Sequence, residues 1–295
     1  MTEENKKNWY ENNYKLLLIL PAILLIFSLV YLVQFNAENG DLIYKDISLT
    51  GGTSITVFDE STDIEDLKIK LENNFPDIIV RTISNFRTGE QQAFFVETTA
   101  EVDKIKPALE NYLGYNLDST NSSTEFTGSS LSEGFYQQLK IAIIIAFIFM
   151  AIVVFIIFRT PIPSFAVVLS AFMDIVMTLA VINLMGMSLS IAGIVALLML
   201  IGYSVDTDIL LTTRMIRKKE GTLNSRMFGA LKTGLTMTLT SIAAILVALL
   251  IIYTFSETLR QMFTIILIGL GFDLFNTWIT NASILKWYAG AKNIR

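Results

Sequence analysis

The sequence predicts a polytopic α-helical membrane protein with six transmembrane helices and one extracytoplasmic α+β domain of the ferredoxin-like pattern. The chain has 295 residues, of which 53% are hydrophobic, and its mean hydropathy is +0.54. Both values exceed those of ordinary soluble domains. Six mostly apolar stretches approach or exceed the roughly 20 residues that cross a bilayer as a helix. The segment between the first and second stretches has the composition of a soluble domain.

The six predicted spans lie at about 15–33, 139–158, 164–184, 189–211, 235–254 and 259–283. The first, KLLLILPAILLIFSLVYLV, is longer than the core of a cleaved signal peptide, and no A-x-A-like site follows it, so we expect it to remain as an anchor. The predicted organisation is a cytoplasmic N-terminus (1–14), a first helix (15–35), an external domain (36–137), a five-helix region (138–287) with a cytoplasmic loop (212–232), and a cytoplasmic C-terminus (288–295).

The distribution of charge predicts the orientation of the chain. Residues 36–137 hold 18 acidic against 7 basic side chains, a net charge of −11, whereas the rest of the chain has a net charge of +6. On one side of the predicted spans there are thirteen basic residues: Lys6, Lys7, Lys15, Arg159, Arg214, Arg217, Lys218, Lys219, Arg226, Lys232, Lys286, Lys292 and Arg295. The two short loops opposite hold only Arg260. The positive-inside rule therefore predicts a multi-pass protein of the cytoplasmic membrane with both termini in the cytoplasm. Outside these loops the sequence has no cluster of basic residues that would indicate nucleic-acid binding.

The external segment predicts the element order β-α-β-β-α-β, the ferredoxin-like pattern. The expected elements are strand 54–58, helix 62–74, strand 78–83, strand 93–98, helix 101–113 and a last strand before 127. A Thr62-x-x-Glu65 capping box would open the first helix. Pro107 argues against the second helix, because an interior proline kinks or breaks a helix. The hydroxyl-rich stretch STNSSTEFTGSS (119–130) is expected to be a mobile linker into the second span.

Four acidic residues lie within the predicted membrane spans: Asp174, Asp206, Asp208 and Asp273. With a rise of 1.5 Å per residue, Asp174 lies about 14 Å into its span, whereas Asp206 and Asp273 lie about 24 Å and about 21 Å from the outer ends of theirs. These depths predict that Asp174, Asp206 and Asp273 converge on one interior site. Because desolvation disfavours a charged carboxylate, such a group takes up a proton, and the set is typical of a proton or cation pathway. The alternative is that the acids only hydrogen-bond neighbouring helices, with Asp208 reaching the interface to pair with Arg214.

Other residues near these acids have two interpretations each. Arg214 is either a gate or a positive-inside anchor, and Gly202 allows either close helix packing or local unwinding. Gly51 and Gly52 form either a tight turn that needs positive φ or a hinge beneath the external domain. The chain has no histidine and no cysteine, so we expect no metal site and no cofactor, and proton handling falls to carboxylates, tyrosines or lysines.

Four motifs carry a resemblance to a known family: LTGGT (49–53), DIVMTL (174–179), IGYSVDTDILLTTR (201–214) and TLTSIAA (238–244). Together with the order of one span, a domain and five spans, the chain resembles the archaeal branch of the SecF family of protein-export membrane proteins. This resemblance implies a helix bundle of the proton-driven efflux-pump (RND-like) type, a role in export rather than enzymatic catalysis, and no cofactor. It implies four partners: SecD, a SecYEG-type translocon, the exported unfolded polypeptide and membrane lipid.

The resemblance also transfers site residues. The family's transmembrane acids fall on Asp174 and on the Asp206-Thr207-Asp208 segment, and its basic residue falls on Arg214. Two positions depart from the family, since Met173 stands where a histidine is frequent and Thr236-Met237 stands where Arg-Thr is found.

Three alternative functions stay open at this point. A self-contained proton-coupled exporter of small molecules would have the same intramembrane acids. An intramembrane aspartyl protease would use IGLGFD (268–273) with YSVD (203–206), although both depart in spacing from the protease motifs, and its two carboxyls would have to share a proton. An assembly subunit would hold a partner at the translocon without any coupling to protons.

Overall fold

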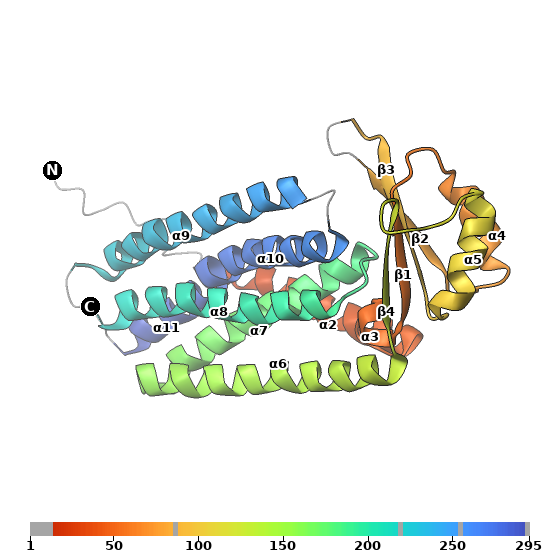
Figure 1. Ribbon diagram of the computed structural model, residues 1–295. Coiled ribbons are helices and arrows are strands. Elements are labelled where there is room, and N and C mark those ends of the chain that lie inside the picture. Colours follow the sequence, from red (N-terminus) through yellow and green to blue (C-terminus); the bar gives the residue numbers. More distant parts are fainter. Residues whose placement is uncertain (1–13, 85–87, 218–220, 253–255, 293–295) are drawn as a thin grey trace.

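The computed structural model describes residues 14–84, 88–217, 221–252 and 256–292 and consists of a helix bundle with a smaller α+β domain at one end (Figure 1). Six helices of the described chain are long and apolar enough to cross a membrane, which confirms the predicted fold class. Some residues that entered the orientation prediction lie outside the described residues: Lys6, Lys7, Lys218, Lys219 and Arg295.

The bundle is formed by α2 (Ile19–Asn39), α6 (Ser129–Phe158), α7 (Pro161–Leu184), α8 (Ile191–Thr212), α9 (Leu223–Ile252) and α10 (Glu257–Phe275). The π-helical segment η2 (Thr213–Arg217) extends α8, and η3 (Asn276–Asn281) extends α10 into α11 (Ala282–Ala291). Every predicted span overlaps one of these helices. The Lys286 ammonium lies 5.4 Å from the centroid of the Tyr14 ring, so the start of the first span and the end of the last lie at the same end of the bundle.

Helix α7 is the centre of the bundle and is the most buried of the six. It begins at Pro161, where the missing N–H of proline costs no helical hydrogen bond. In contrast, α6 and α9 bury few of their side chains within this chain, as expected for helices that face lipid. Close packing of α10 on α8 requires Gly269, since a Cβ atom at that position would lie 2.2 Å from the Leu200 side chain.

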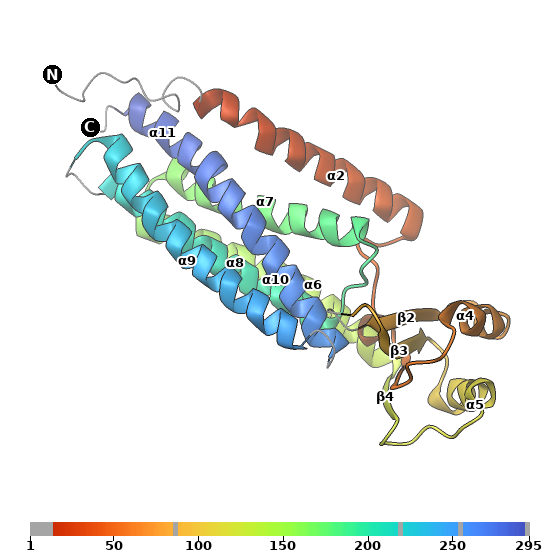
Figure 2. The ribbon, with the colours of Figure 1, turned by 90° about the horizontal axis from the view of Figure 1, so that it is seen from above.

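The α+β domain contains β1 (Gly52–Val57), α4 (Ile64–Glu72), β2 (Ile79–Ser84), β3 (Gln91–Thr98), α5 (Val102–Leu113) and β4 (Ser122–Thr127). Its strands form one antiparallel sheet in the order β2-β3-β1-β4, as the ferredoxin-like pattern predicts. Helices α4 and α5 cover the face of the sheet that points away from the bundle, and the other face is turned toward the bundle (Figures 1 and 2). The covered face carries the fully buried side chains of Ile55, Val57 and Phe94.

Two local predictions about this domain need correction, whereas the predicted helix 101–113 is confirmed as α5. The N-cap of α4 is Asp63, whose carboxylate accepts from the backbone N–H groups of the second and third helical residues, so Thr62 does not cap it. Helix α5 continues through Pro107 and forgoes one backbone hydrogen bond there. Residues 119–130 are not a linker, because β4 pairs with β1 along its whole length and α6 begins at Ser129 directly afterwards. The predicted last strand before 127 is confirmed as β4.

A short segment between α2 and β1 joins the domain to the bundle, and it includes α3 (Ile47–Thr50). Its backbone pairs with the loop between α7 and α8: Leu189 N–H donates to the Tyr44 carbonyl at 2.6 Å, and Asp46 N–H donates to the Leu189 carbonyl at 3.0 Å. The Asn183 side chain, near the end of α7, donates to the Leu42 carbonyl at 2.7 Å. The domain is therefore attached to the end of α7 and the start of α8 by hydrogen bonds as well as by the chain itself.

Candidate functional site

The first acid of the site is Asp174, at the middle of the central helix α7, with no exposed surface. Its two carboxylate oxygens accept from different elements. Ser204 Oγ on α8 donates to Oδ2 at 2.6 Å, and Asn276 Nδ2 on η3 donates to Oδ1 at 2.7 Å. Asp174 thus joins three helices of the bundle through its carboxylate.

The second and third acids, Asp208 on α8 and Asp273 on α10, are also completely buried. One hydroxyl lies between them: Thr277 Oγ1 is 2.9 Å from Asp208 Oδ1 and 3.1 Å from Asp273 Oδ1. Asn281 Nδ2 donates to the same Asp208 oxygen at 2.7 Å. The structure therefore brings Asp174, Asp208 and Asp273 into one cluster, which we call the acidic cluster.

The π-helical segment η3 supplies most of the hydrogen-bond donors of the acidic cluster. A π-turn widens the helix by one residue, and such turns occur frequently at functional sites. Here the turn places four polar side chains in the interior, each at most 3% exposed: Asn276, Thr277, Thr280 and Asn281. Sequence analysis did not select these residues, although the polar pattern NTxxTN inside an otherwise apolar span was a signal that could have found them.

The acidic cluster has no basic partner in the described part of the chain. No described lysine or arginine forms an ion pair with any of the three carboxylates. The second oxygens of Asp208 and Asp273 are buried without a hydrogen-bond partner from the described residues. Burying three carboxylates without a cation is costly when they are ionised, so the arrangement is chemically suited to groups that gain and lose protons.

The predicted convergence was correct for Asp174 and Asp273 and wrong for Asp206. The side chain of Asp206 is on the exposed surface of α8, whereas Asp208 occupies the interior position. Successive α-helical residues are about 100° apart, so positions 206 and 208 cannot both face the interior. Ser204 and Asp208, four residues apart, share the buried face.

The alternative pairing of Asp208 with Arg214 does not occur. Arg214 lies in η2, and its guanidinium donates to the Gly229 carbonyl on α9 at 2.6 Å. Arg214 therefore links two helices at the end of the bundle opposite the α+β domain. This contact is compatible with a positional anchor, and it leaves the acidic cluster without a guanidinium.

The structure distinguishes the three glycines that the sequence singled out. Gly51 has a φ of +81° and Gly52 a φ of +139°, and added Cβ atoms would lie 2.3 Å from the Ser129 backbone and 2.3 Å from the Thr98 carbonyl oxygen, respectively. Both positions therefore need glycine for a tight turn with close backbone approach. Gly202 lies on the exposed face of α8, and a Cβ atom there would meet open space, so none of the described helices packs on it.

Comparison with known proteins decides the family. The family model for "Protein export membrane protein SecD/SecF, C-terminal" matches residues 108–291. The chain belongs to this family. Among full-length relatives of this SecD/SecF family member, the protein-export membrane protein SecF of Methanocaldococcus jannaschii is 39% identical over 282 residues, which cover 94% of this chain and 96% of the relative. The SecF of Pyrococcus furiosus is 34% identical over 287 residues, which cover 97% and 95%.

The fold of this SecD/SecF family member also matches a solved structure. The crystal structure of SecDF, described as a translocon-associated membrane protein from Thermus thermophilus, superimposes with a TM-score of 0.76 at 19% sequence identity. The match covers 98% of this chain but 40% of the SecDF chain. The likeness supports the arrangement of six membrane helices and a small α+β domain.

Proposed function

We propose that this chain is the SecF subunit of a Sec protein-export complex, in which it pairs with SecD and assists polypeptides across the cytoplasmic membrane using the proton gradient. Two comparisons support the export role. Relatives named as SecF match over more than nine tenths of their length and of this chain. The SecDF chain is much longer than this one, which leaves room in that protein for a second part in the position of SecD.

The acidic cluster is the observation that carries the proton coupling. A hydroxyl has one proton to donate, but Thr277 Oγ1 lies within hydrogen-bond distance of two carboxylate oxygens. Both contacts are satisfied only when one of the two carboxyls is protonated and donates to the hydroxyl oxygen. The geometry around Thr277 therefore favours one proton bound between Asp208 and Asp273.

Release of that proton changes contacts between helices. An ionised Asp208 needs donors, which Asn281 and Thr277 of η3 provide. A protonated carboxyl needs one acceptor instead. Because these partners lie on η3 and the acid lies on α8, gain and loss of a proton alters the attraction between the two helices, which is the coupling that a proton-driven machine requires.

Asp206 is the residue that we assign to the interface with SecD. A charged carboxylate facing lipid at membrane depth costs about 2.5 to 3.5 kcal/mol, and Asp206 is exposed on this chain alone. Gly202, one turn earlier, leaves space on the same helix for close approach of another helix. We therefore place SecD against this face of α8, with Asp206 covered by the partner.

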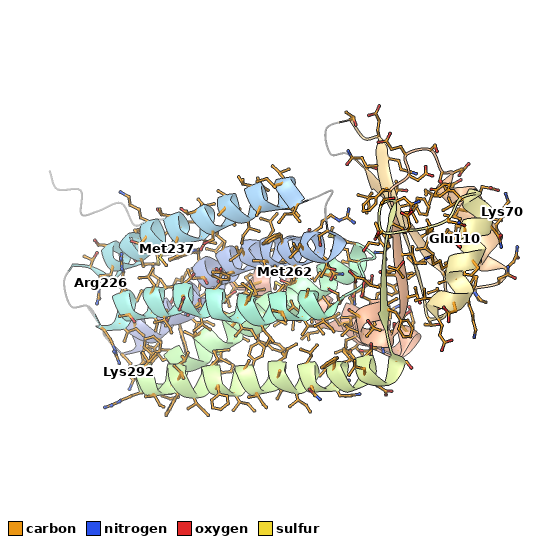
Figure 3. The ribbon with its side chains drawn as sticks, viewed as in Figure 1. Lys70, Glu110, Arg226, Met237, Met262 and Lys292 are labelled. Atoms are coloured by element: carbon orange, nitrogen blue, oxygen red, sulfur yellow. The ribbon has the colours of Figure 1, made fainter. Side chains whose placement is uncertain are left out.

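The orientation follows from the two ends of the molecule. Arg226 and Lys292 lie at one end of the bundle, whereas Lys70 and Glu110 lie on the helices of the domain at the other end (Figure 3). We place the end with Arg226 and Lys292 in the cytoplasm by the positive-inside rule. The α+β domain then lies outside, where the translocon delivers the exported polypeptide.

The protease alternative requires Asp206 beside Asp273. The structure instead has Asp273 in the interior of the bundle and Asp206 on the exposed face of α8. The motif pair that suggested a protease does not form a carboxyl dyad here.

The experiment that tests the proposal is export of a reporter protein in membranes that carry Asp174→Asn or Asp208→Asn. We expect intact complexes with SecD and slow export that no longer responds to the gradient, whose electrical part supplies about 2.3 kcal/mol per charge per 100 mV. Asp103→Asn, on the exposed surface of α5, is the control of equal charge change and should export normally.

Each other outcome has a definite meaning. Gradient-dependent export at the normal rate in both cluster variants would reject the coupling and leave an assembly subunit. Purification of the chain without SecD, under conditions that preserve other complexes, would point to a self-contained exporter.

A further inference from the structure

Helix α6 runs along one edge of the bundle from the foot of the α+β domain to the opposite end (Figure 1), and a basic residue marks each limit of its apolar run. Lys140 is the last charged residue before this run, and Arg159 follows directly after it. The two residues are nineteen positions apart, which is about 28 Å along a helix. Because this length matches the roughly 30 Å thickness of the hydrocarbon core of a bilayer, Arg159 lies where hydrocarbon meets lipid headgroups.

One face of α6 that leads toward Arg159 is apolar and open. Its side chains recur at intervals of three or four residues, so they share one side of the helix. Each is at least 49% exposed: Phe149, Ile152, Val153 and Ile156. We call this surface the α6 apolar face. Since the described helices leave it uncovered, lipid acyl chains can lie along it as far as Arg159.

The backbone of Arg159 has a conformation that favours glycine. Its φ is +53°, and it is the only described residue other than glycine with a positive φ. This conformation costs a residue with a Cβ atom about 1 to 2 kcal/mol, and helices often end on glycine for this reason. The Arg159 side chain is exposed and forms no hydrogen bond or ion pair with a described residue. Contacts within the described chain therefore do not explain an arginine at this position.

A second guanidinium lies at the same turn of α6. Arg217, the last residue of η2, donates to the Ile157 carbonyl, and its guanidinium carbon is 5.8 Å from the centroid of the Phe158 ring. The final carbonyls of a helix lack helical partners, so Arg217 also caps α6. This cap uses a neutral acceptor and leaves other N–H groups of the five in a guanidinium free to donate. Neither Arg217 nor Arg159 forms an ion pair in the described part of the chain, so two positive charges stand at this end of α6.

We propose that Arg159 and Arg217 bind the phosphate of an anionic phospholipid whose acyl chain lies along the α6 apolar face. Guanidinium groups recognise phosphate oxygens through paired charge-assisted hydrogen bonds. A phospholipid complements both parts of this site, since its phosphate matches the arginines and its hydrocarbon matches the apolar face. Free phosphate would match only the arginines. The proposal depends neither on proton coupling nor on pairing with SecD.

The opposite end of the apolar run differs, because its cations lie beside an acid. The Lys140 ammonium is 4.4 Å from the centroid of the Tyr136 ring, and the Lys45 ammonium is 5.1 Å from the same centroid. Lys45 is paired with Asp41 at 3.2 Å, and the Tyr136 hydroxyl donates to the same carboxylate at 2.5 Å. This end of α6 therefore provides an internal comparison with a lower net positive charge.

The first test measures which lipid lies against the α6 apolar face. Because the chain has no cysteine, Ile156→Cys accepts a single fluorophore on the full chain in phosphatidylcholine vesicles. The quencher is a small fraction of lipid with a nitroxide on its acyl chain, either phosphatidylglycerol or phosphatidylcholine. We expect phosphatidylglycerol to quench more strongly at equal mole fraction. Arg159→Gln and Arg217→Gln should each lower its relative affinity about fivefold, the contribution of one basic side chain beside anionic lipid.

Three controls separate this site from misfolding and from net charge. Arg159→Gly suits the positive φ, so it should fold at least as well and still lose the preference for phosphatidylglycerol. Lys232→Gln removes an equal charge from the exposed surface of α9 and should keep that preference. A fluorophore on Ile144→Cys, one turn after Lys140, should show a weaker preference. Equal quenching by both lipids at position 156, or equal loss in Lys232→Gln, would overturn the proposal.

The second test distinguishes the possible occupants. Inorganic phosphate and chloride are added at matched ionic strength, and we expect both to reduce quenching by phosphatidylglycerol equally through screening. Selective displacement by inorganic phosphate would overturn the proposal and assign the arginines to a free anion. The measurement is then repeated with SecD in the vesicles, where the preference should persist. Its loss would overturn the proposal and assign this end of α6 to the partner subunit. Because neither measurement uses a gradient, failure of proton coupling would leave both results intact.

Discussion

The hydroxyl of Thr277 provides the sharpest test of the acidic cluster. The change is Thr277→Val, which keeps the branched shape of the side chain but removes the oxygen. That oxygen is 2.9 Å from Asp208 Oδ1 and 3.1 Å from Asp273 Oδ1. Asp208 would keep its bond from Asn281 at 2.7 Å, whereas Asp273 would lose its contact with the Thr277 hydroxyl.

The magnitude follows from the loss at Asp273. A hydrogen bond to a charged group contributes about 1.5 to 3 kcal/mol, so the ionised form of Asp273 becomes less favourable by roughly 10- to 150-fold. A cycle that passes through this ionised form should slow by a comparable factor. The protein should still fold, because valine fills the same volume and leaves no buried hydroxyl.

The assay is gradient-dependent export in vesicles, with purification of the SecD complex as the check on assembly. Thr277→Ser, which retains a hydroxyl, should preserve most of the gradient response. Thr264→Val is the matched control on the same helix, since the Thr264 hydroxyl donates only to the Arg260 carbonyl of its own helix. If Thr277→Val exports with the same gradient response as Thr264→Val, the cluster does not hold the coupling proton.

Three further predictions concern other parts of the chain. Gly51→Ala should lower the melting temperature of the full chain by more than Gly40→Ala. Both glycines have positive φ, where an alanine costs about 1 to 2 kcal/mol. Only Gly51 also lies against a neighbouring backbone, that of α6. Asp206→Cys, in a chain that otherwise lacks cysteine, should react with a thiol reagent when the chain is alone and be protected when SecD is present. Burial works to raise the pKa of Asp59, but hydrogen bonds led by the one from Tyr115 at 2.7 Å lower it to about 2. The resulting stabilisation is present above the ordinary pKa of 3.8 and is lost as pH falls through about 2, so Tyr115→Phe should destabilise the domain by about 1 kcal/mol at neutral pH and by much less at pH 2, as measured by thermal unfolding of the full chain.

The parts of the fold that depend on composition and period were predictable from the sequence. The length of the apolar stretches predicted the membrane helices, because transfer of apolar side chains into lipid dominates the free energy of membrane insertion. The alternation of short strands and helices gave the ferredoxin-like order, even though Pro107 argued against one helix. A last strand before 127 was predicted correctly, but its position within 119–130 was not, because β4 is stabilised by main-chain pairing with β1, which leaves little trace in the side chains.

The acidic cluster was only partly predictable, for a geometric reason. The depth of a residue along a helix can be counted from the sequence at 1.5 Å per residue. This count correctly predicted that Asp174 and Asp273 lie in one region of the bundle. The direction in which a side chain points depends on the neighbouring helices, and this decided between Asp206 and Asp208. The π-turn at Asn276–Asn281 shifts the helical phase again, so a regular period could not show that Thr277 and Asn281 face the acids.

The backbone pairing of Tyr44 and Asp46 with Leu189 has a structural consequence. Leu189 lies just before α8, which continues without interruption from Ile191 to Asp208, a length of about 26 Å at 1.5 Å per residue. A single uninterrupted helix therefore runs from the segment that holds the α+β domain to the carboxylate of Asp208 in the acidic cluster.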